Sequence, residues 1–254
     1  MALFTDGLVS AMEDLIAQDS QLGNVASVEG IDVTQKLGLA QEELALEIIT
    51  LLSGSRRAEL AVWLSTQPKI ENVVVTPVLK LWHIFRTLEM VYGDAYSSQL
   101  NDRYAAKRDQ FRERATWAYE RLLLLGIGIA WSPIPRAQLP QVVNAAGSVP
   151  DATYYASMTW TNAKSEEGSP SLPSTITTAA STFLVQPTTR PAVAIGWNIY
   201  VGSAPDTLYR QNSTAIGANQ TWLQPNVVEV AGAGPGWGQA PNYLMPMPRM
   251  ILRG

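Results

Sequence analysis

The sequence contains no cysteine and only one histidine in 254 residues. The absence of cysteine excludes disulfide bonds, a thiolate nucleophile and zinc sites with sulfur ligands, and it suits a chain that folds in a reducing cytoplasm. The single histidine, His83, has no second imidazole with which to complete a zinc site. We therefore expect no metal centre built on cysteine or histidine.

The sequence also lacks long apolar runs and any excess of positive charge. No segment approaches the roughly 18 continuous apolar residues of a membrane-spanning helix. Residues 1–15 have no basic stretch and contain Asp6, Glu13 and Asp14, unlike a secretory signal. A net charge of -4 provides no field that would gather nucleic acid. We expect a soluble protein that is not secreted, does not contact a membrane and does not bind DNA specifically.

No reactive centre can be built around the histidine. His83 lies within the very apolar segment Leu81–Phe85, which indicates a packed core residue. Serine hydrolase chemistry would depend on this same histidine, and no Gly-x-Ser-x-Gly motif accompanies it. The pattern disfavours nucleophilic hydrolysis.

Two acidic pairs and one glycine-rich segment also have simpler structural interpretations. Glu42–Glu43 is typical of a solvated helix face, and Glu166–Glu167 of a hairpin tip, rather than of a glycosidase pair. The segment Gly232–Gly236 lacks the following lysine of a phosphate-binding loop. We predict no catalytic, cofactor-binding or metal-binding residue, and we expect that the protein is not an enzyme.

The chemistry of the chain changes at Trp131–Pro135. About 29 of the 40 charged residues precede this point, although it lies near the middle of the sequence. We expect an α+β multidomain chain with four parts: an α-helical bundle with one long helix at residues 1–130, a linker at 131–150, a β-sandwich at 151–230, and an extended Gly/Pro/Met-rich docking arm at 231–254.

Apolar residues recur at helical spacing through the first half. The spacing predicts helices at residues 2–18, 32–54, 58–64, 78–92 and 97–125, with Asp32 as an N-cap and Pro77 in a first turn. Gly23 and Asn24 should end the first helix, and Gly38 should break the second.

The segment 97–125 is predicted as the long helix. Its apolar stripe includes Phe111 and should pack against another helix, while Arg108 and Arg112 lie on the remaining surface. Two interpretations stay open: the apolar stripe packs against helices of the same chain, or it makes lateral contact with another copy.

The second half alternates at the period of strands. Strands are predicted at residues 153–162, 174–178, 182–186, 196–202, 207–210 and 221–223, separated by Gly, Pro and Asn turns. Trp160 and Trp197 lie within these strands, where a large aromatic side chain usually fills the space between two sheets. A sugar-binding face is the alternative.

The arm contains too much glycine and proline to fold alone, yet it carries many apolar side chains that should dock on a partner. Its candidate interface residues, with those of the long helix above, are Trp237, Tyr243, Leu244, Met245, Met247, Met250, Ile251, Leu252 and Arg253.

The β half resembles fibronectin type III and immunoglobulin-like modules. The resemblance lies in Tyr154–Ala163 (YYASMTWTNA), Glu166–Ser171 (EEGSPS) and Gly196–Gly202 (GWNIYVG). These motifs stand in the reverse of their usual order, which implies a circularly rearranged strand order.

The helical half resembles head-to-tail adaptor (neck or connector) proteins of tailed bacteriophages. The resemblance lies in Ile31–Glu43 (IDVTQKLGLAQEE), Leu81–Leu88 (LWHIFRTL) and Tyr96–Tyr104 (YSSQLNDRY). It implies a structural virion protein, made in the host cytoplasm, that forms a homo-oligomeric ring, commonly of twelve copies, at the head–tail junction.

The implied partners are the portal protein, a tail or tail-completion protein and the capsid, with DNA passing through the ring without specific binding. The alternative is a phage surface decoration or adhesion module whose sandwich binds carbohydrate, for which exposed Trp and Tyr on one sheet would be required.

Overall fold

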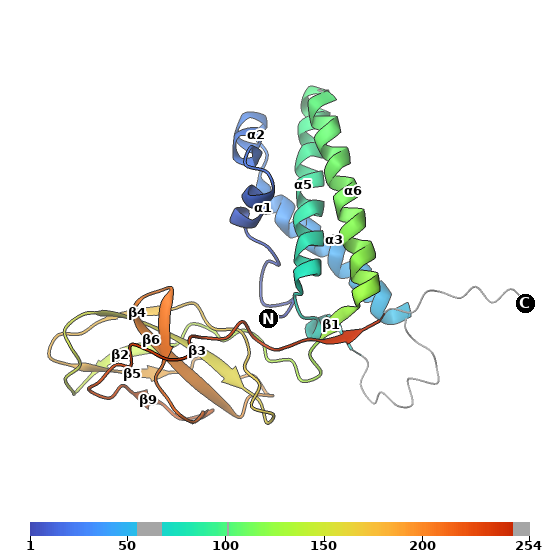
Figure 1. Ribbon diagram of the computed structural model, residues 1–254. Coiled ribbons are helices and arrows are strands. Elements are labelled where there is room, and N and C mark those ends of the chain that lie inside the picture. Colours follow the sequence, from blue (N-terminus) through green and yellow to red (C-terminus); the bar gives the residue numbers. More distant parts are fainter. Residues whose placement is uncertain (55–67, 101, 246–254) are drawn as a thin grey trace, which may run out of the picture. The chain divides into compact units, whose positions relative to one another are not determined.

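The computed structural model describes residues 1–54, 68–100 and 102–245; the helix expected at 58–64 lies outside them. The protein is α+β, with helices in its N-terminal half and mainly antiparallel sheets in its C-terminal half (Figure 1). The chain divides into two compact units. The helical unit comprises Gly7–Ile129 and Pro241–Gly254, and the β unit comprises Met1–Asp6 and Ala130–Ala240.

Two long antiparallel helices, α5 and α6, form the centre of the helical unit, and α3 packs against α5 (Figure 1). The helices are α1 (Met12–Gln18), α2 (Leu22–Glu29), α3 (Val33–Gly54), the 3-10 helix η1 (Ile70–Asn72), α5 (Pro77–Gln99) and α6 (Asp102–Leu125). None of the described helices is both long and apolar enough to cross a bilayer.

Capping residues set two of the helix starts, and the sequence predicted both the Asp32 cap and the first-turn position of Pro77. Asp32 Oδ1 accepts a hydrogen bond from the backbone N–H of Gln35 at 3.1 Å, before α3. Thr76 Oγ1 accepts one from Leu79 at 3.4 Å, and Pro77 occupies the first turn of α5, where its missing N–H costs nothing.

Three details of the helix predictions were wrong. Residues 2–18 do not form one helix, because Leu3 and Phe4 are buried in the β unit and α1 begins only at Met12. Gly23 and Asn24 lie inside α2, and Gly38 lies inside an unbroken α3, since packing of a helix face outweighs the weak helix propensity of glycine.

The predicted helix at 97–125 is divided. Leu100 takes a left-handed φ of 49° and ends α5, so that α6 begins at Asp102 and returns along α5. Aromatic rings hold the pair together: Phe111 of α6 is 6.5 Å from Phe85 and 5.7 Å from Tyr92, measured between ring centroids.

The β unit contains two antiparallel sheets. Their strands are β2 (Gln141–Ala145), β3 (Thr153–Thr161), β4 (Ser174–Thr177), β5 (Thr182–Gln186), β6 (Gly196–Ala204), β7 (Thr207–Arg210), β8 (Ile216–Gly217) and β9 (Trp222–Leu223). One sheet has the order β2-β5-β9, and the other has the order β4-β3-β6-β7, with β8 also on β6. The expected linker at 131–150 is wrong in part, because β2 lies within it and pairs with β5.

Side chains from both sheets share one buried cluster. Trp160 of β3 lies opposite Trp197 of β6, and Phe183 of β5 joins them from the other sheet. Burial of each large aromatic side chain contributes on the order of 2 to 3 kcal/mol. Every second residue of β3, from Tyr154 to Trp160, and of β6, from Trp197 to Val201, belongs to this core, as the alternation of side chains along a strand requires.

The end of the chain is built into both units, so the expectation of a separate arm at 231–254 is wrong for its described part. Buried Gln239 donates to Ser132 O at 3.0 Å and accepts from the backbone N–H of Ile134 at 2.7 Å, within the β unit. Strand β10 (Asn242–Leu244) then pairs with β1 (Ile127–Ile129) in the helical unit.

Candidate functional site

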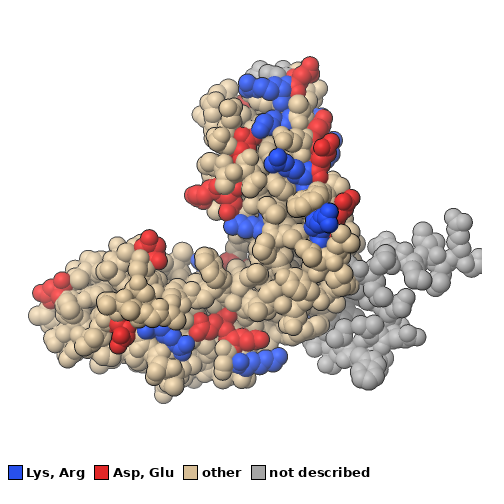
Figure 2. Space-filling view, viewed as in Figure 1, with Lys and Arg blue, Asp and Glu red and all other residues tan. Residues whose placement is uncertain are grey.

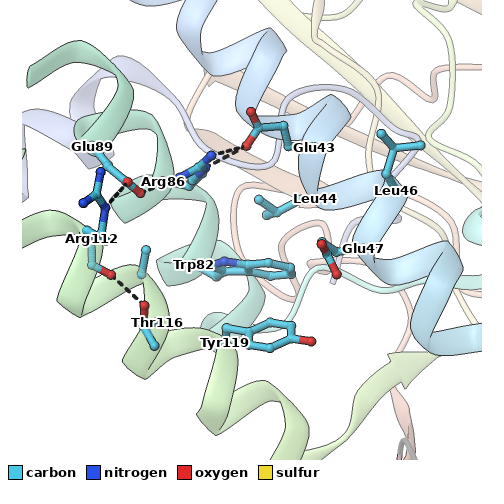
Figure 3. Close-up of a pocket in the computed structure, with 11 residues that line it drawn as sticks. Glu43, Leu44, Leu46, Glu47, Trp82, Arg86, Glu89, Arg112, Thr116 and Tyr119 are labelled. Atoms are coloured by element: carbon cyan, nitrogen blue, oxygen red, sulfur yellow. Dashed lines mark hydrogen bonds and ion pairs between the residues drawn. The ribbon is translucent and has the colours of Figure 1, made fainter. Parts of the chain in front are cut away.

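The helical unit carries a groove whose floor is α5 and whose walls are α3 and α6 (Figure 3). Its larger section has a volume of about 530 Å³. A second section of about 450 Å³ continues toward the start of α3, and the two sections share Glu43, Leu46, Arg86, Glu89 and Arg112. Together the two sections form one elongated surface on a single unit.

One part of the groove is apolar and aromatic. Trp82 of α5 and Tyr119 of α6 lie side by side with ring centroids 5.0 Å apart, and Leu44 and Leu46 of α3 approach from the opposite wall (Figure 3). Leu46 is 68% exposed, so the rim of the groove presents an apolar side chain to solvent. Burial of the Tyr119 phenol raises its pKa, and the nearby Glu47 carboxylate adds to the increase. Tyr119 is therefore neutral at physiological pH.

The other part of the groove is a chain of alternating charges. Arg86 lies between two carboxylates, at 2.7 Å from Glu43 and 2.6 Å from Glu89, and Arg112 donates to Glu89 at 2.9 Å (Figure 3). Burial opposes the charged form of Arg86, but its bonds to Glu43 and Glu89 outweigh burial and raise its pKa. These side chains are held in fixed positions and present polar groups in a set geometry.

This arrangement suits recognition of a protein surface. Each guanidinium is already paired, and the described parts of the chain contain no group of three or more His, Asp or Glu side chains that could hold a metal ion. Protein interfaces typically combine buried aromatic side chains, apolar side chains and a charged rim, as this groove does. Aromatic and arginine side chains contribute most of the binding free energy at such interfaces.

A second surface of the helical unit exposes large apolar side chains on α6. Trp117 is 47% exposed and Leu124 is 62% exposed, and the guanidinium of Arg121 lies 5.8 Å from the centre of the Trp117 ring. Exposed apolar side chains that gather on one helix face indicate a contact surface.

The candidate interface residues of the long helix are only partly at the surface. Phe111 is buried among the aromatic rings of its own helical unit, so its assignment to an interface was wrong and the apolar stripe packs within the chain. Arg108 lies over the Tyr96 ring at 4.9 Å and pairs with Asp109, while Arg112 lines the groove.

The described candidate residues of the arm are divided between the two compact units, with Trp237 in the β unit and Tyr243, Leu244 and Met245 in the helical unit. Trp237, Tyr243 and Met245 are 88%, 56% and 54% exposed, and Tyr243 and Leu244 belong to β10. The partners of these two in β1 are Gly128 and Ile127. The remaining candidates, Met247, Met250, Ile251, Leu252 and Arg253, lie outside the described residues.

Other sequence predictions are settled by burial. His83 is a buried core residue, and Trp160 and Trp197 are buried between the sheets instead of forming a sugar-binding face. Glu167 is not simply a solvated tip, because Tyr200 donates to it at 2.8 Å and Asn198 also bonds to it. Burial and the bond to Glu167 raise the pKa of Tyr200.

Sequence reasoning did not single out the groove or the exposed side chains of α6. Neither Leu46 nor Trp117 was singled out from the sequence, although both are exposed. The available signal was Trp117 with Arg114, Arg121 and Leu124, because these residues step by three and four along one helix face.

Comparisons with known proteins add no relative: no family model matches the chain, and no curated protein or solved structure matches it.

Proposed function

We propose that this protein is a structural virion protein of a tailed bacteriophage, which forms a homo-oligomeric ring joining the portal to the tail. The helical unit would build the ring and line the DNA conduit. The observation that carries the proposal is the groove of α3, α5 and α6 together with the exposed apolar side chains on α3 and α6. These surfaces suit contacts between copies, because permanent assemblies bury apolar patches of this kind.

The distribution of charge supports the same role. In the view of Figure 2, Lys, Arg, Asp and Glu side chains crowd the helical unit and are sparse on the β unit. Both signs are interspersed there, so the surface can form ion pairs with a copy of itself without attracting DNA along its whole length. A conduit should let DNA pass without holding it, which agrees with the net charge of -4.

For the β unit we infer a fibronectin type III or immunoglobulin-like sandwich with rearranged strand order. In the immunoglobulin fold, strands A, B and E are neighbours in one sheet, and G, F and C in the other. The orders β2-β5-β9 and β4-β3-β6-β7 have the same neighbours if β2 is A, β5 is B and β9 is E. β4, β3, β6 and β7 are then G, F, C and C′. On this assignment F and G precede B and C along the chain, as the reversed motifs suggest.

The β unit would project from the ring as a collar or contact the capsid vertex. The alternative role, a decoration or adhesion module that binds carbohydrate, needs exposed aromatic side chains on one sheet. Trp160 and Trp197 are buried, and Trp222 of β9 is partly buried against the same core, so no observation on the described strands favours this alternative.

Native mass spectrometry of the purified chain tests the proposal. Twelve copies of the 27.7 kDa chain would give a species of about 330 kDa, and closed rings should keep one mass over a hundredfold range of concentration. A monomer that shifts in mass or mobility on binding glycans, but never on concentration, would instead support the adhesion role.

A further inference from the structure

The helical unit presents two different faces, on helices of opposite net charge. One is the groove described above, whose α3 wall is acidic: α3 has three glutamates and a single lysine. The other, which we call the α6 ridge, consists of Arg114, Trp117, Arg121 and Leu124. α6 as a whole has six basic and four acidic side chains. The two helices therefore carry opposite net charge.

The α6 ridge lies on one continuous stripe of the helix surface. Its residues are spaced by three, four and three, so their side chains lie one above another, and all four are exposed. The ridge does not line the groove of its own chain, to which α6 instead contributes Arg112, Thr116 and Tyr119. Because the ridge and the groove lie on different sides of one unit, they cannot contact each other within a single copy.

The α3 wall of the groove combines exposed leucines with exposed carboxylates, whereas the ridge has arginines. Leu46 and Leu39 are 68% and 41% exposed, and the exposed carboxylates Glu42 and Glu47 lie on the same stretch of α3. A tryptophan flanked by arginines fits a site with an aromatic floor, an apolar rim and acidic neighbours, because Trp and Arg are the side chains that most often dominate interfaces.

We propose that the α6 ridge of one copy seats in the α3–α5–α6 groove of the next copy. Trp117 covers Leu46 beside Trp82 and Tyr119, while Arg114 and Arg121 meet the carboxylates of α3. Such a contact joins two unlike surfaces, so it repeats head to tail and closes into a ring when the rotation allows. This inference rests on the proposed ring and identifies the faces that build it.

Charge reversal of each face tests the contact. The first variant carries Glu42→Lys and Glu47→Lys, and the second carries Arg114→Glu and Arg121→Glu. Each variant alone brings like charges together, so the ring peak of the wild-type chain should be lost, with at least tenfold weaker association. Equimolar mixing should restore rings, because each reversed face then meets a complementary one, and these rings should contain an even number of copies in strict alternation.

A matched control for the first variant carries the same increase of charge away from both faces, with Asp206→Lys and Glu229→Lys in the exposed loops of the β unit. This control should assemble as the wild type does. Thermal unfolding of every variant separates lost assembly from lost folding, which matters because Arg114 also lies 5.8 Å from the ring centres of Phe85 and Phe111.

The outcomes distinguish this inference from the proposed function. If the wild type forms rings and the folded variants do so equally well, the contact is overturned while the ring stands. If folded variants fail and the mixture stays dissociated, the two faces do not meet each other and the contact is again overturned. If the wild-type chain is monomeric, both the ring and the contact are overturned.

Discussion

The hydroxyl group of Ser10 donates a hydrogen bond to Nδ1 of His83 across 2.7 Å, and both residues are buried. The direction of this bond follows from the other ring nitrogen. Nε2 lies 3.0 Å from the carbonyl oxygen of Leu37, which can only accept, so the proton of the neutral ring is on Nε2. The imidazole thus ties the N-terminal segment and α3 to α5.

Acid should weaken the helical unit through this histidine. Burial lowers the pKa of His83 below its usual 6.5, although the bond to Leu37 opposes the shift. Below about pH 6.5 the histidine of the unfolded chain binds a proton, whereas the buried His83 of the folded chain stays neutral. The free energy of unfolding should therefore fall as the pH falls through about 6.5, and it should not change with pH above that value. Urea unfolding at a series of pH values measures this slope.

The variant His83→Gln provides the control for that prediction. It is expected to be less stable overall, by about 1 to 3 kcal/mol for a disrupted buried hydrogen bond. Its stability should no longer change between about pH 5 and pH 6.5, since His83 is the one histidine of the sequence. An unchanged slope in the variant would show that a different group causes the pH dependence.

Asp19 should be a stronger determinant of stability than its position near the N-terminus suggests. It is buried and accepts hydrogen bonds from Tyr92 at 2.7 Å and from Lys107 at 2.9 Å, which connects the first helices to α5 and α6. We expect Asp19→Asn to lower the free energy of unfolding by about 2 kcal/mol, because a charge-assisted buried bond is lost.

The control for this change is Asp109→Asn, which removes an exposed carboxylate that pairs with Arg108 at 2.8 Å. It should cost less than about 1 kcal/mol, as surface ion pairs do. Burial alone would raise the pKa of Asp19, but its bonds to Lys107 and Tyr92 outweigh burial and lower it. The stability contributed by Asp19 should therefore be lost only as pH falls below about 3.8. Equal effects of the two substitutions would contradict the buried role of Asp19.

Gly128 should be essential for pairing of the C-terminal strand. A Cβ atom at this position would lie 2.7 Å from Cγ2 of Thr76 and 2.9 Å from Cβ of Pro241. Gly128→Val should therefore separate β10 from β1 and disturb Thr76, the N-cap of α5, at a cost of about 1 to 3 kcal/mol. Hydrogen–deuterium exchange of residues 241–245 should become faster; unchanged exchange would mean that the strand tolerates the side chain.

Gly38 offers the opposite expectation, because an added Cβ would meet no atom within 4 Å. It lies inside α3, where alanine has the higher helix propensity. Gly38→Ala should raise the free energy of unfolding by about 0.5 to 1 kcal/mol. A lower urea midpoint in this variant would indicate that the helix needs the glycine for a contact outside the helical unit.

Local sequence patterns predicted six of the eight described strands of the β unit and missed β2 and β8. The bounds of β5 and β7 agree with the predicted segments 182–186 and 207–210, because alternating Thr, Tyr and Leu residues end at clear turn residues. The short strands β1 and β10 were missed. They pair across more than a hundred residues, and three residues carry too little periodicity to identify a strand.

The helices show the same limit. Periodicity placed Leu3 with the first helix, yet this residue is buried in the β unit, because an apolar side chain does not reveal which core will receive it. The groove was also beyond prediction. Spacing indicates that Trp82 and Tyr119 lie on helices, but their contact depends on how α5 and α6 pack.

Electron microscopy of the purified chain tests the central claim most directly. Class averages should show closed rings of one size with an open centre, formed without any other protein, since the ridge and the groove supply both halves of each contact. Single copies at every concentration, or open filaments in place of closed rings, would contradict the account.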